Sequence, residues 1–498
     1  MLRDSRPAKF GSGGARLGPW GLPWSWLAGA LLLHLLPFAT RPALIGGDEP
    51  HYALLAHSLA SDCDLELSDD YAAVEEGSAA AGRKRAGQGL DRHLREYEGR
   101  FLPAHPAGVP ALLAPLLAAQ MAIAPAAAPD LIIGLAGLAL TFAALVSGAR
   151  LLGLWLADPL TGAVAAFAAY FCSPLWFHSR TFFTEPYTWS LAVLSIAATS
   201  AGRLFLGSVL LGLTLVTKES ALLLVVVVLA GVAACLGLRR AAVLAMGPAT
   251  TGTLWVVSNV ARGLPPFLTS QPFQAGDLLD GARGLFLAAD RGLIWFAPLL
   301  VAGTAAWLAS AAGDALRQRH RPAQVCARGA TEPTPGIADD APGPDRFARE
   351  STAGPEHRFL PLFAVLALAA YFSLAAAWID WRGGSGFGPR LLLPGLPGLA
   401  LPLASVIRTG RRALRLFLAA LGVAGFTVGW CAALDPVGAF WDPTVLSLVT
   451  ARPAVTAAGL ALATWIALRV LRLLPFTRPA TTWAATTSGE ARIRKLEP

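Results

Sequence analysis

Charged residues are scarce in this chain. Asp, Glu, Lys and Arg make up 14% of its 498 residues, whereas hydrophobic residues make up 55% and the mean hydropathy is +0.53. Soluble domains carry about 25% charged residues, so this composition excludes the soluble class. Because long apolar segments cross a bilayer as helices, we predict an all-α polytopic membrane protein.

A disulfide framework is also lacking. The sequence has five cysteines, of which Cys172, Cys235 and Cys431 lie inside apolar segments. Cys326 lies in a basic segment, and Cys63 lies in an acidic segment without a visible partner. This distribution predicts no disulfide scaffold.

Blocks of positive charge are absent as well, although the net charge is +8. Lys and Arg occur singly or in short clusters between apolar segments, where they act as orientation signals. We therefore predict no nucleic-acid partner. The first apolar segment, 20–38, follows a basic leader and lacks a small-residue cleavage site. It is therefore expected to be an uncleaved signal anchor with a cytoplasmic N-terminus.

Apolar segments long enough to cross a membrane predict about twelve transmembrane helices. They lie at 20–38, 131–153, 155–176, 186–202, 204–217, 220–238, 241–261, 291–312, 358–378, 390–407, 415–433 and 453–474. The segment 102–124 is apolar but contains four prolines, and we place it in the membrane interface. Only Lys218 and Glu219 separate 204–217 from 220–238. These two segments could instead be one helix, which would invert the topology downstream.

This count places the basic clusters between helices on the cytoplasmic side, as the positive-inside rule requires. The predicted organisation is a cytoplasmic leader (1–19), an N-terminal transmembrane module (20–312), a disordered cytoplasmic linker (313–357), a C-terminal transmembrane module (358–474) and a basic cytoplasmic tail (475–498). Within the first module, the loop 42–102 is extracytoplasmic and 102–124 is interfacial. We expect an integral plasma (inner) membrane protein with both termini in the cytoplasm.

Two adjacent carboxylates follow the first apolar segment, in the stretch Gly46-Gly47-Asp48-Glu49-Pro50-His51-Tyr52. Carboxylates are costly to keep beside lipid, so the pair indicates a functional site. Pro50 suits the first turn of a helix, which we expect to run along the bilayer surface. The residues expected to face lipid from it are Tyr52, Leu55 and Leu59. In the alternative interpretation, Asp48 and Glu49 only cap this helix.

Further polar residues interrupt the apolar pattern at segment ends on the predicted outer side. They are Arg180, Glu185, Lys218, Glu219, Asp290, Arg291, Arg382 and Arg390. Together with Asp48 they combine a carboxylate that can accept a proton with cations that can hold an anion. A lipid-linked phosphate would satisfy those cations.

Each of these groups also has a structural interpretation. Arg180 and Glu185 could be a plain interfacial ion pair. Asp290 with Arg291 could simply begin a helix. The glycines before Arg390 could form a tight turn, or they could expose backbone N–H groups at a helix N-terminus as an anion site. Lys218 interrupts a long apolar run and so must be paired or solvated.

No cofactor is predicted. Asp48 and His51 have a spacing that a metal site could use, but a lone Asp-His pair is weak evidence, so a divalent metal is not supported.

Three motifs, in their order along the chain, resemble those of the GT-C superfamily of membrane glycosyltransferases, which includes protein O-mannosyltransferases and the bacterial aminoarabinose transferase. The motifs are Gly47-Asp48-Glu49-Pro50-His51-Tyr52, Leu213-Thr214-Leu215-Val216-Thr217-Lys218, and Trp381-Arg382-Gly383-Gly384 with Phe387-Gly388-Pro389-Arg390-Leu391-Leu392-Leu393-Pro394. The resemblance covers residues 20–435. The family has interfacial helices in its first outer loop, in agreement with the placement of 102–124. It often has an Asp in the second outer loop, where this chain has Arg180 and Glu185.

The resemblance implies transfer of a hexosyl or pentosyl group from a polyprenyl-phosphate donor to a glycan, lipid or protein acceptor at the extracytoplasmic face. It implies that Asp48 is the general base, with Glu49 orienting the acceptor or tuning Asp48. Lys218 and Arg390 would hold the donor phosphate, with Arg382 as a further candidate, and Arg180 and Glu185 would contribute from the second loop. In-line displacement by this route inverts the anomeric carbon.

The main alternative is a transporter or flippase for a lipid-linked or small anionic substrate. Such a protein would place its basic residues near the membrane midplane and interrupt helices in both halves. Here the charges lie at segment ends, and no internal repeat is visible. A nucleotide-sugar donor is not expected, because no nucleotide-binding βαβ pattern is present.

Overall fold

The computed structural model describes residues 24–40, 46–75, 92–124, 129–261, 264–266, 273–319, 356–384 and 386–474. The predicted leader (1–19) and tail (475–498) lie outside the described residues, as does most of the predicted linker (313–357). Helices occupy both ends of this linker: α14 (Pro298–Arg319) continues to Arg319, and α17 (Glu356–Ala376) begins at Glu356.

The remaining elements follow in chain order. The first group is α1 (Trp24–Thr40), α2 (Glu49–Ser61), α3 (Ser68–Glu75), strands β1 (Leu94–Tyr97) and β2 (Arg100–Pro103), and α4 (Gly108–Ile123). The second is α5 (Pro129–Leu156), α6 (Pro159–Phe171), α7 (Leu175–His178), α8 (Thr184–Ser200), α9 (Leu204–Thr217), α10 (Ala221–Leu236), α11 (Leu238–Ala261), α12 (Leu278–Leu287) and α13 (Leu293–Phe296). The last is the 3-10 helices η1 (Arg390–Leu392) and η2 (Leu396–Leu399), then α18 (Ala400–Thr409), α19 (Arg412–Leu434), α20 (Pro436–Trp441), α21 (Val445–Ala451) and α22 (Pro453–Leu473).

The lengths of the helices and the composition of the protein surface are typical of a helical membrane protein. Four helical segments in the described part of the chain are long and apolar enough to cross a bilayer: Leu131–Leu156, Leu238–Ala261, Arg412–Leu434 and Pro453–Leu473. Shorter apolar helices, among them α1, α6, α9 and α10, pack beside them. Large apolar side chains such as Leu32, Phe205 and Leu460 are exposed on the bundle exterior, as lipid contact permits and water does not.

The alternative of one helix over 204–238 is wrong, because α9 ends at Thr217 and α10 begins at Ala221. Lys218, Glu219 and Ser220 form the turn between them, and the backbone of Lys218 is extended. The prediction of one continuous helix over 390–407 is also wrong. There the chain forms η1 and η2 before α18 begins, because Pro394 and Pro397 break the helical hydrogen-bond ladder.

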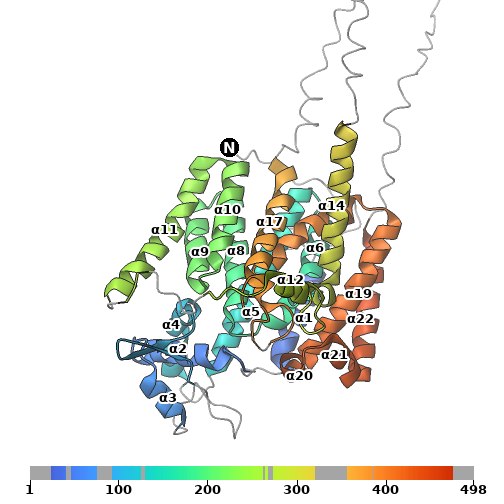
Figure 1. The fold of residues 1–498 in the computed structure, drawn as a ribbon. Coiled ribbons are helices and arrows are strands. Elements are labelled where there is room, and N and C mark those ends of the chain that lie inside the picture. The colour runs from blue at the N-terminus through green and yellow to red at the C-terminus, as the bar shows by residue number, and fades with distance from the viewer. Residues whose placement is uncertain are drawn as a thin grey trace, which may run out of the picture.

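Elements α2, α3, α4 and the β1–β2 hairpin gather at one end of the bundle, the lower end in Figure 1. The prediction that one face of α2 meets lipid is wrong. Tyr52 and Leu55 are buried and Leu59 is half-buried, because α2 lies against α4, α5 and α3. Its apolar residues therefore serve the protein core.

One aromatic-rich cluster joins this end of the bundle to the membrane helices. It contains Tyr52 of α2, Val109 of α4, Phe182 and Phe183 before α8, and Phe440 of α20. Burying such large side chains contributes roughly 1.5–3 kcal/mol each. The cluster therefore holds the N-terminus of α2 against the segment between α7 and α8.

Helix α4 also makes a backbone contact with the end of α9. A Cβ atom at Gly108 would collide with the carbonyl of Val216, so only glycine fits where the first turn of α4 crosses α9. This contact lies immediately before Lys218.

Candidate active site

Glu185 is the centre of a buried charge cluster. It lies in the first turn of α8, and its side chain is 3% exposed. Lys218 donates to Glu185 Oε1 at 2.9 Å, and Arg390 Nε lies 3.9 Å from the same oxygen. Removing either cation would leave an uncompensated charge inside the protein, which is strongly unfavourable. The three residues come from α8, the α9–α10 turn and η1, which are distant in sequence.

Asp48 joins this cluster through Arg390. Arg390 Nη2 donates to Asp48 Oδ2 at 3.2 Å. Asp48 occupies the N-cap position of α2, but its side chain makes no capping hydrogen bond. The interpretation of Asp48 as a helix cap is therefore wrong. Its side chain is 25% exposed, whereas that of Arg390 is 9% exposed, so the carboxylate is the more accessible partner.

Burial and neighbouring cations act in opposite directions on the pKa of Asp48. Burial raises the pKa, but the opposing positive charges, of which Arg390 contributes most, outweigh burial and hold the pKa below its ordinary value. Asp48 is consequently ionised at neutral pH.

Glu49 has a different environment from its neighbour. It is fully buried, and its Oε1 accepts a hydrogen bond from the backbone N–H of Phe182 at 2.8 Å. Its Oε2 accepts from the N–H of Gly46 at 3.3 Å. Arg180, also buried, donates to the carbonyl of Pro37 at 3.1 Å. These bonds tie α1, α2 and the segment before α8 together.

Arg390 is held by a glycine-rich turn and an aromatic ring. Its guanidinium lies 4.1 Å from the ring centre of Phe183, a cation–π distance. Gly383, Gly384, Gly386 and Gly388 have φ values of +67°, +69°, +150° and +65°, a region that favours glycine. The turn therefore depends on these glycines to present Arg390.

The sequence analysis counted Arg291 among the cations at segment ends, or as the start of a helix, and did not predict its partners. Arg291 is buried and donates to the carbonyls of Gly384, at 2.7 Å, and Gly386. The turn thus uses its carbonyls to bind a cation. Arg390 begins a 3-10 helix of three residues instead of the longer helix expected there, and the anion site of backbone N–H groups stays a prediction. An Arg between two short apolar segments was the only sequence signal.

In the described part of the chain, Arg382 does not join the buried charge cluster around Glu185. Its side chain is 57% exposed and pairs with Asp290 at 2.9 Å. The structure thus brings together Asp48, Glu185, Lys218 and Arg390, and it places Arg382 in a surface ion pair.

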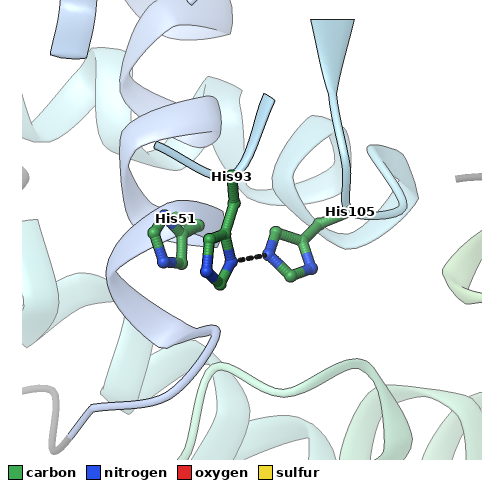
Figure 2. Close-up of side chains that lie close together, drawn as sticks. All are labelled: His51, His93 and His105. Atoms are coloured by element: carbon green, nitrogen blue, oxygen red, sulfur yellow. Dashed lines mark hydrogen bonds between the residues drawn. The ribbon is translucent and has the colours of Figure 1, made fainter. Parts of the chain in front are cut away.

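Three histidines lie beside Asp48: His51 of α2, His93 before β1 and His105 after β2 (Figure 2). His93 Nδ1 and His105 Nε2 are 2.9 Å apart. Burial lowers the pKa of His105 to about 4, against the opposing charge of Asp48, so its ring is neutral at pH 7. Sequence reasoning considered only His51, because His93 and His105 have no recognisable metal spacing.

The charge cluster can support two chemical tasks. Asp48 can accept a proton, and Lys218, whose side chain is 20% exposed, can reach an anion with Arg390. The two carboxylates and two cations balance formally, so an incoming phosphate would have to share or replace the carboxylate contacts of the cations.

Comparison with known proteins gives one structural similarity. No family model matches the sequence, and no curated protein matches it. The structure is similar to a crystal structure of ArnT from Cupriavidus metallidurans bound to undecaprenyl phosphate, with a TM-score of 0.46 and 14% identity, covering 90% of this chain and 75% of that one.

Proposed function

We propose that this protein is a membrane glycosyltransferase that moves a sugar from a polyprenyl-phosphate donor to an acceptor at the extracytoplasmic face. The observation that carries the proposal is the link from Asp48 through Arg390 to Glu185 and Lys218. A partly exposed carboxylate next to two cations matches what such a transfer needs, a proton acceptor beside a phosphate-binding pair.

In the proposed reaction, the acceptor hydroxyl gives its proton to Asp48 while its oxygen bonds to the anomeric carbon of the sugar. The bond from that carbon to the phosphate oxygen breaks, and the bonding electrons leave with the lipid phosphate. Lys218 and Arg390 stabilise the negative charge that grows on the phosphate. Attack opposite the leaving group inverts the anomeric carbon.

Arg390 couples donor binding to the strength of the base. Without donor, its guanidinium is paired with Asp48 and lowers the pKa of that carboxyl. A donor phosphate that draws Arg390 toward itself weakens this pairing. Burial then raises the pKa of Asp48, which makes it a better proton acceptor once the donor is bound.

The remaining polar residues position this machinery. Glu49 and Arg180 fix the elements around Asp48 through backbone hydrogen bonds, and Arg291 fixes the turn that carries Arg390. We assign no direct role in phosphate binding to Arg382, because it pairs with Asp290 in an exposed position.

Both predicted modules contribute to the proposed site. Asp48, Glu185 and Lys218 belong to the module 20–312, and Arg390 belongs to the module 358–474. In the proposed orientation, the loop 42–102 and the site face the extracytoplasmic side, and both termini are cytoplasmic.

The test is the substitution Asp48→Asn, which keeps the size of the side chain and removes the proton acceptor. We expect transfer to fall by about a hundredfold or more, the usual loss when a general base is removed. The measurement is release of polyprenyl phosphate from labelled polyprenyl-phosphate sugars in membranes that contain the native acceptor.

Asp62→Asn is the matched control, since Asp62 is an exposed residue at the other end of α2. It should retain wild-type transfer. Near-normal transfer by Asp48→Asn would remove Asp48 from the mechanism. Movement of the intact lipid-linked sugar across the membrane without cleavage would instead support a flippase.

A further inference from the structure

The histidines of the first loop converge from separate elements. His51 lies in the first turn of α2, and His93 and His105 flank the hairpin. The hairpin register pairs Leu94 with Pro103, and the N–H of Ala104 donates to the carbonyl of His93 at 3.0 Å. His93 and His105 are therefore brought together by the strand pairing.

The three rings face one another in Figure 2, and one candidate ligand atom from each lies within 4.8 Å of the others. His51 and His105 are each 5% exposed, and the rings of His51 and His93 stack with centres 3.8 Å apart. Removing imidazole groups from water costs free energy unless they have polar partners, so a buried histidine cluster favours a bound ligand.

We propose that His51, His93 and His105 bind a zinc ion. Three imidazole nitrogens suit zinc and neighbouring transition metals, whereas magnesium and calcium prefer oxygen ligands. Nitrogens bound to tetrahedral zinc at about 2.0–2.1 Å lie about 3.3 Å apart. The 2.9 Å separation of His93 Nδ1 and His105 Nε2 is a few tenths of an ångström below this value, and the ion would replace their hydrogen bond. The ring of His51, which is stacked on His93, would rotate to point its nitrogen at the same ion.

Histidine ligands usually donate a hydrogen bond from their second ring nitrogen to a neighbouring group, and Tyr71 is such a partner for His51. Its hydroxyl lies 2.7 Å from His51 Nδ1, and it accepts a hydrogen bond from the backbone N–H of His93 at 3.4 Å. With Nδ1–H donating to the Tyr71 oxygen, His51 presents Nε2 to the metal. One side chain of α3 thus orients one ligand and anchors the backbone of a second.

The ion has a structural task in this position. It ties the β1–β2 hairpin to α2, whose preceding residue is Asp48, and so fixes the loop beside the charge cluster. Three protein ligands leave one tetrahedral position for water. The proposal stands apart from sugar transfer, because zinc binding here requires neither donor nor acceptor.

The experiment measures zinc binding to the full-length protein in detergent, purified with a tag that contains no histidine and stripped with a chelator. We expect one zinc per chain by elemental analysis after dialysis against zinc chloride. His93→Gln and His105→Gln should each weaken binding by at least about a hundredfold. Tyr71→Phe should weaken it by about tenfold to a hundredfold, the usual effect of removing an outer partner.

His57→Gln is the matched control, because His57 lies on the same helix and faces Asp70 instead of the cluster. It should bind zinc as the wild type does. Equal loss in His57→Gln, or wild-type binding no tighter than that of His105→Gln, would overturn the proposal.

X-ray absorption of the zinc-loaded wild type identifies the ligands of the ion directly. This test therefore holds even if a variant fails to fold. The expected spectrum shows nitrogen ligands at about 2.0–2.1 Å with the multiple scattering of three imidazole rings. A sulfur ligand, which would place the ion at a cysteine, or fewer than three imidazoles would overturn the proposal.

Discussion

At the scale of single residues, the shared use of Arg390 by two carboxylates decides how the site responds to pH. Asp48 has a lowered pKa in the folded protein. The stability that this ionised carboxylate contributes is present above its ordinary pKa of about 3.8 and is lost as the pH falls through the lower, folded value. Asp48, the proposed proton acceptor, therefore stays ionised throughout the physiological range when no ligand is bound.

Replacing Arg390 with Gln should move this titration upward. Burial raises the pKa of Asp48, and the substitution would remove the largest charge that opposes this effect. The acidic limb of kcat/KM should therefore shift to higher pH. The measurement is kcat/KM for donor consumption between about pH 4 and pH 8. Arg382→Gln is the control, because Arg382 pairs with Asp290 at the surface. Identical profiles for Arg390→Gln and the wild type would show that Arg390 does not govern Asp48.

Individual site residues were only partly predictable from the sequence. Asp48, Lys218 and Arg390 could be found because each interrupts an apolar pattern, where a charge requires a partner or a function. The pairing of Lys218 with Glu185 could not be found, since it depends on how α8 and α9 pack. Arg291 was missed because its partners are backbone carbonyls of a glycine turn, which have no side-chain signature.

At the scale of elements, α4 crosses α9 two residues before Lys218, at the contact between Gly108 and Val216. Gly108→Ala would push a methyl group into the backbone carbonyl of Val216, and backbone cannot move aside as a flexible side chain can. We expect a loss of about 1–3 kcal/mol in stability, the range for overpacked contacts. Donor affinity should fall as well, because Thr217 and Lys218 follow the displaced carbonyl.

Thermal unfolding in detergent and donor binding would measure these two effects. Gly29→Ala in α1 is the control, because nothing lies within 4 Å of a Cβ atom there. Unchanged stability in Gly108→Ala would show that α4 and α9 can separate without cost.

Long apolar elements were the most predictable part of the fold. The predicted segment 204–217 coincides with α9, and 453–474 differs from α22 by one residue at its end. Among the short elements, the helix expected at Pro50 is present as α2, but others were not predicted. The hairpin β1–β2 and helix α3 lie in a polar loop with little periodicity, and their arrangement depends on contacts such as that between His51 and Tyr71. Proline also breaks the segment 390–407, where hydropathy alone indicated one helix.

At the scale of the whole molecule, the orientation in the membrane stays a prediction that labelling can test. Cys63 is exposed in the loop 42–102, whereas Cys326 falls in the linker, outside the described residues. If the loop is extracytoplasmic, a maleimide that cannot cross membranes should label Cys63 in intact cells. Cys326 should be labelled only after permeabilisation.

Cys63→Ser and Cys326→Ser variants assign the labelled position, and a lysed sample shows that both thiols can react. Labelling of Cys326 but not Cys63 in intact cells would reverse the proposed topology. Protection of both would place the loop 42–102 inside the cell.

The ion pair between Asp48 and Arg390 also has a consequence for synthesis. Its two residues are separated by 342 positions, so the carboxylate is made and inserted long before its cation exists. Glu185 and Lys218 can pair earlier, but Asp48 waits for the glycine turn that follows α17. A chain interrupted before residue 390 would hold the proton acceptor without the guanidinium that pairs with it. The proposed chemistry would therefore begin only after Arg390 has been made, so chains that end earlier would not act on the proposed lipid donor.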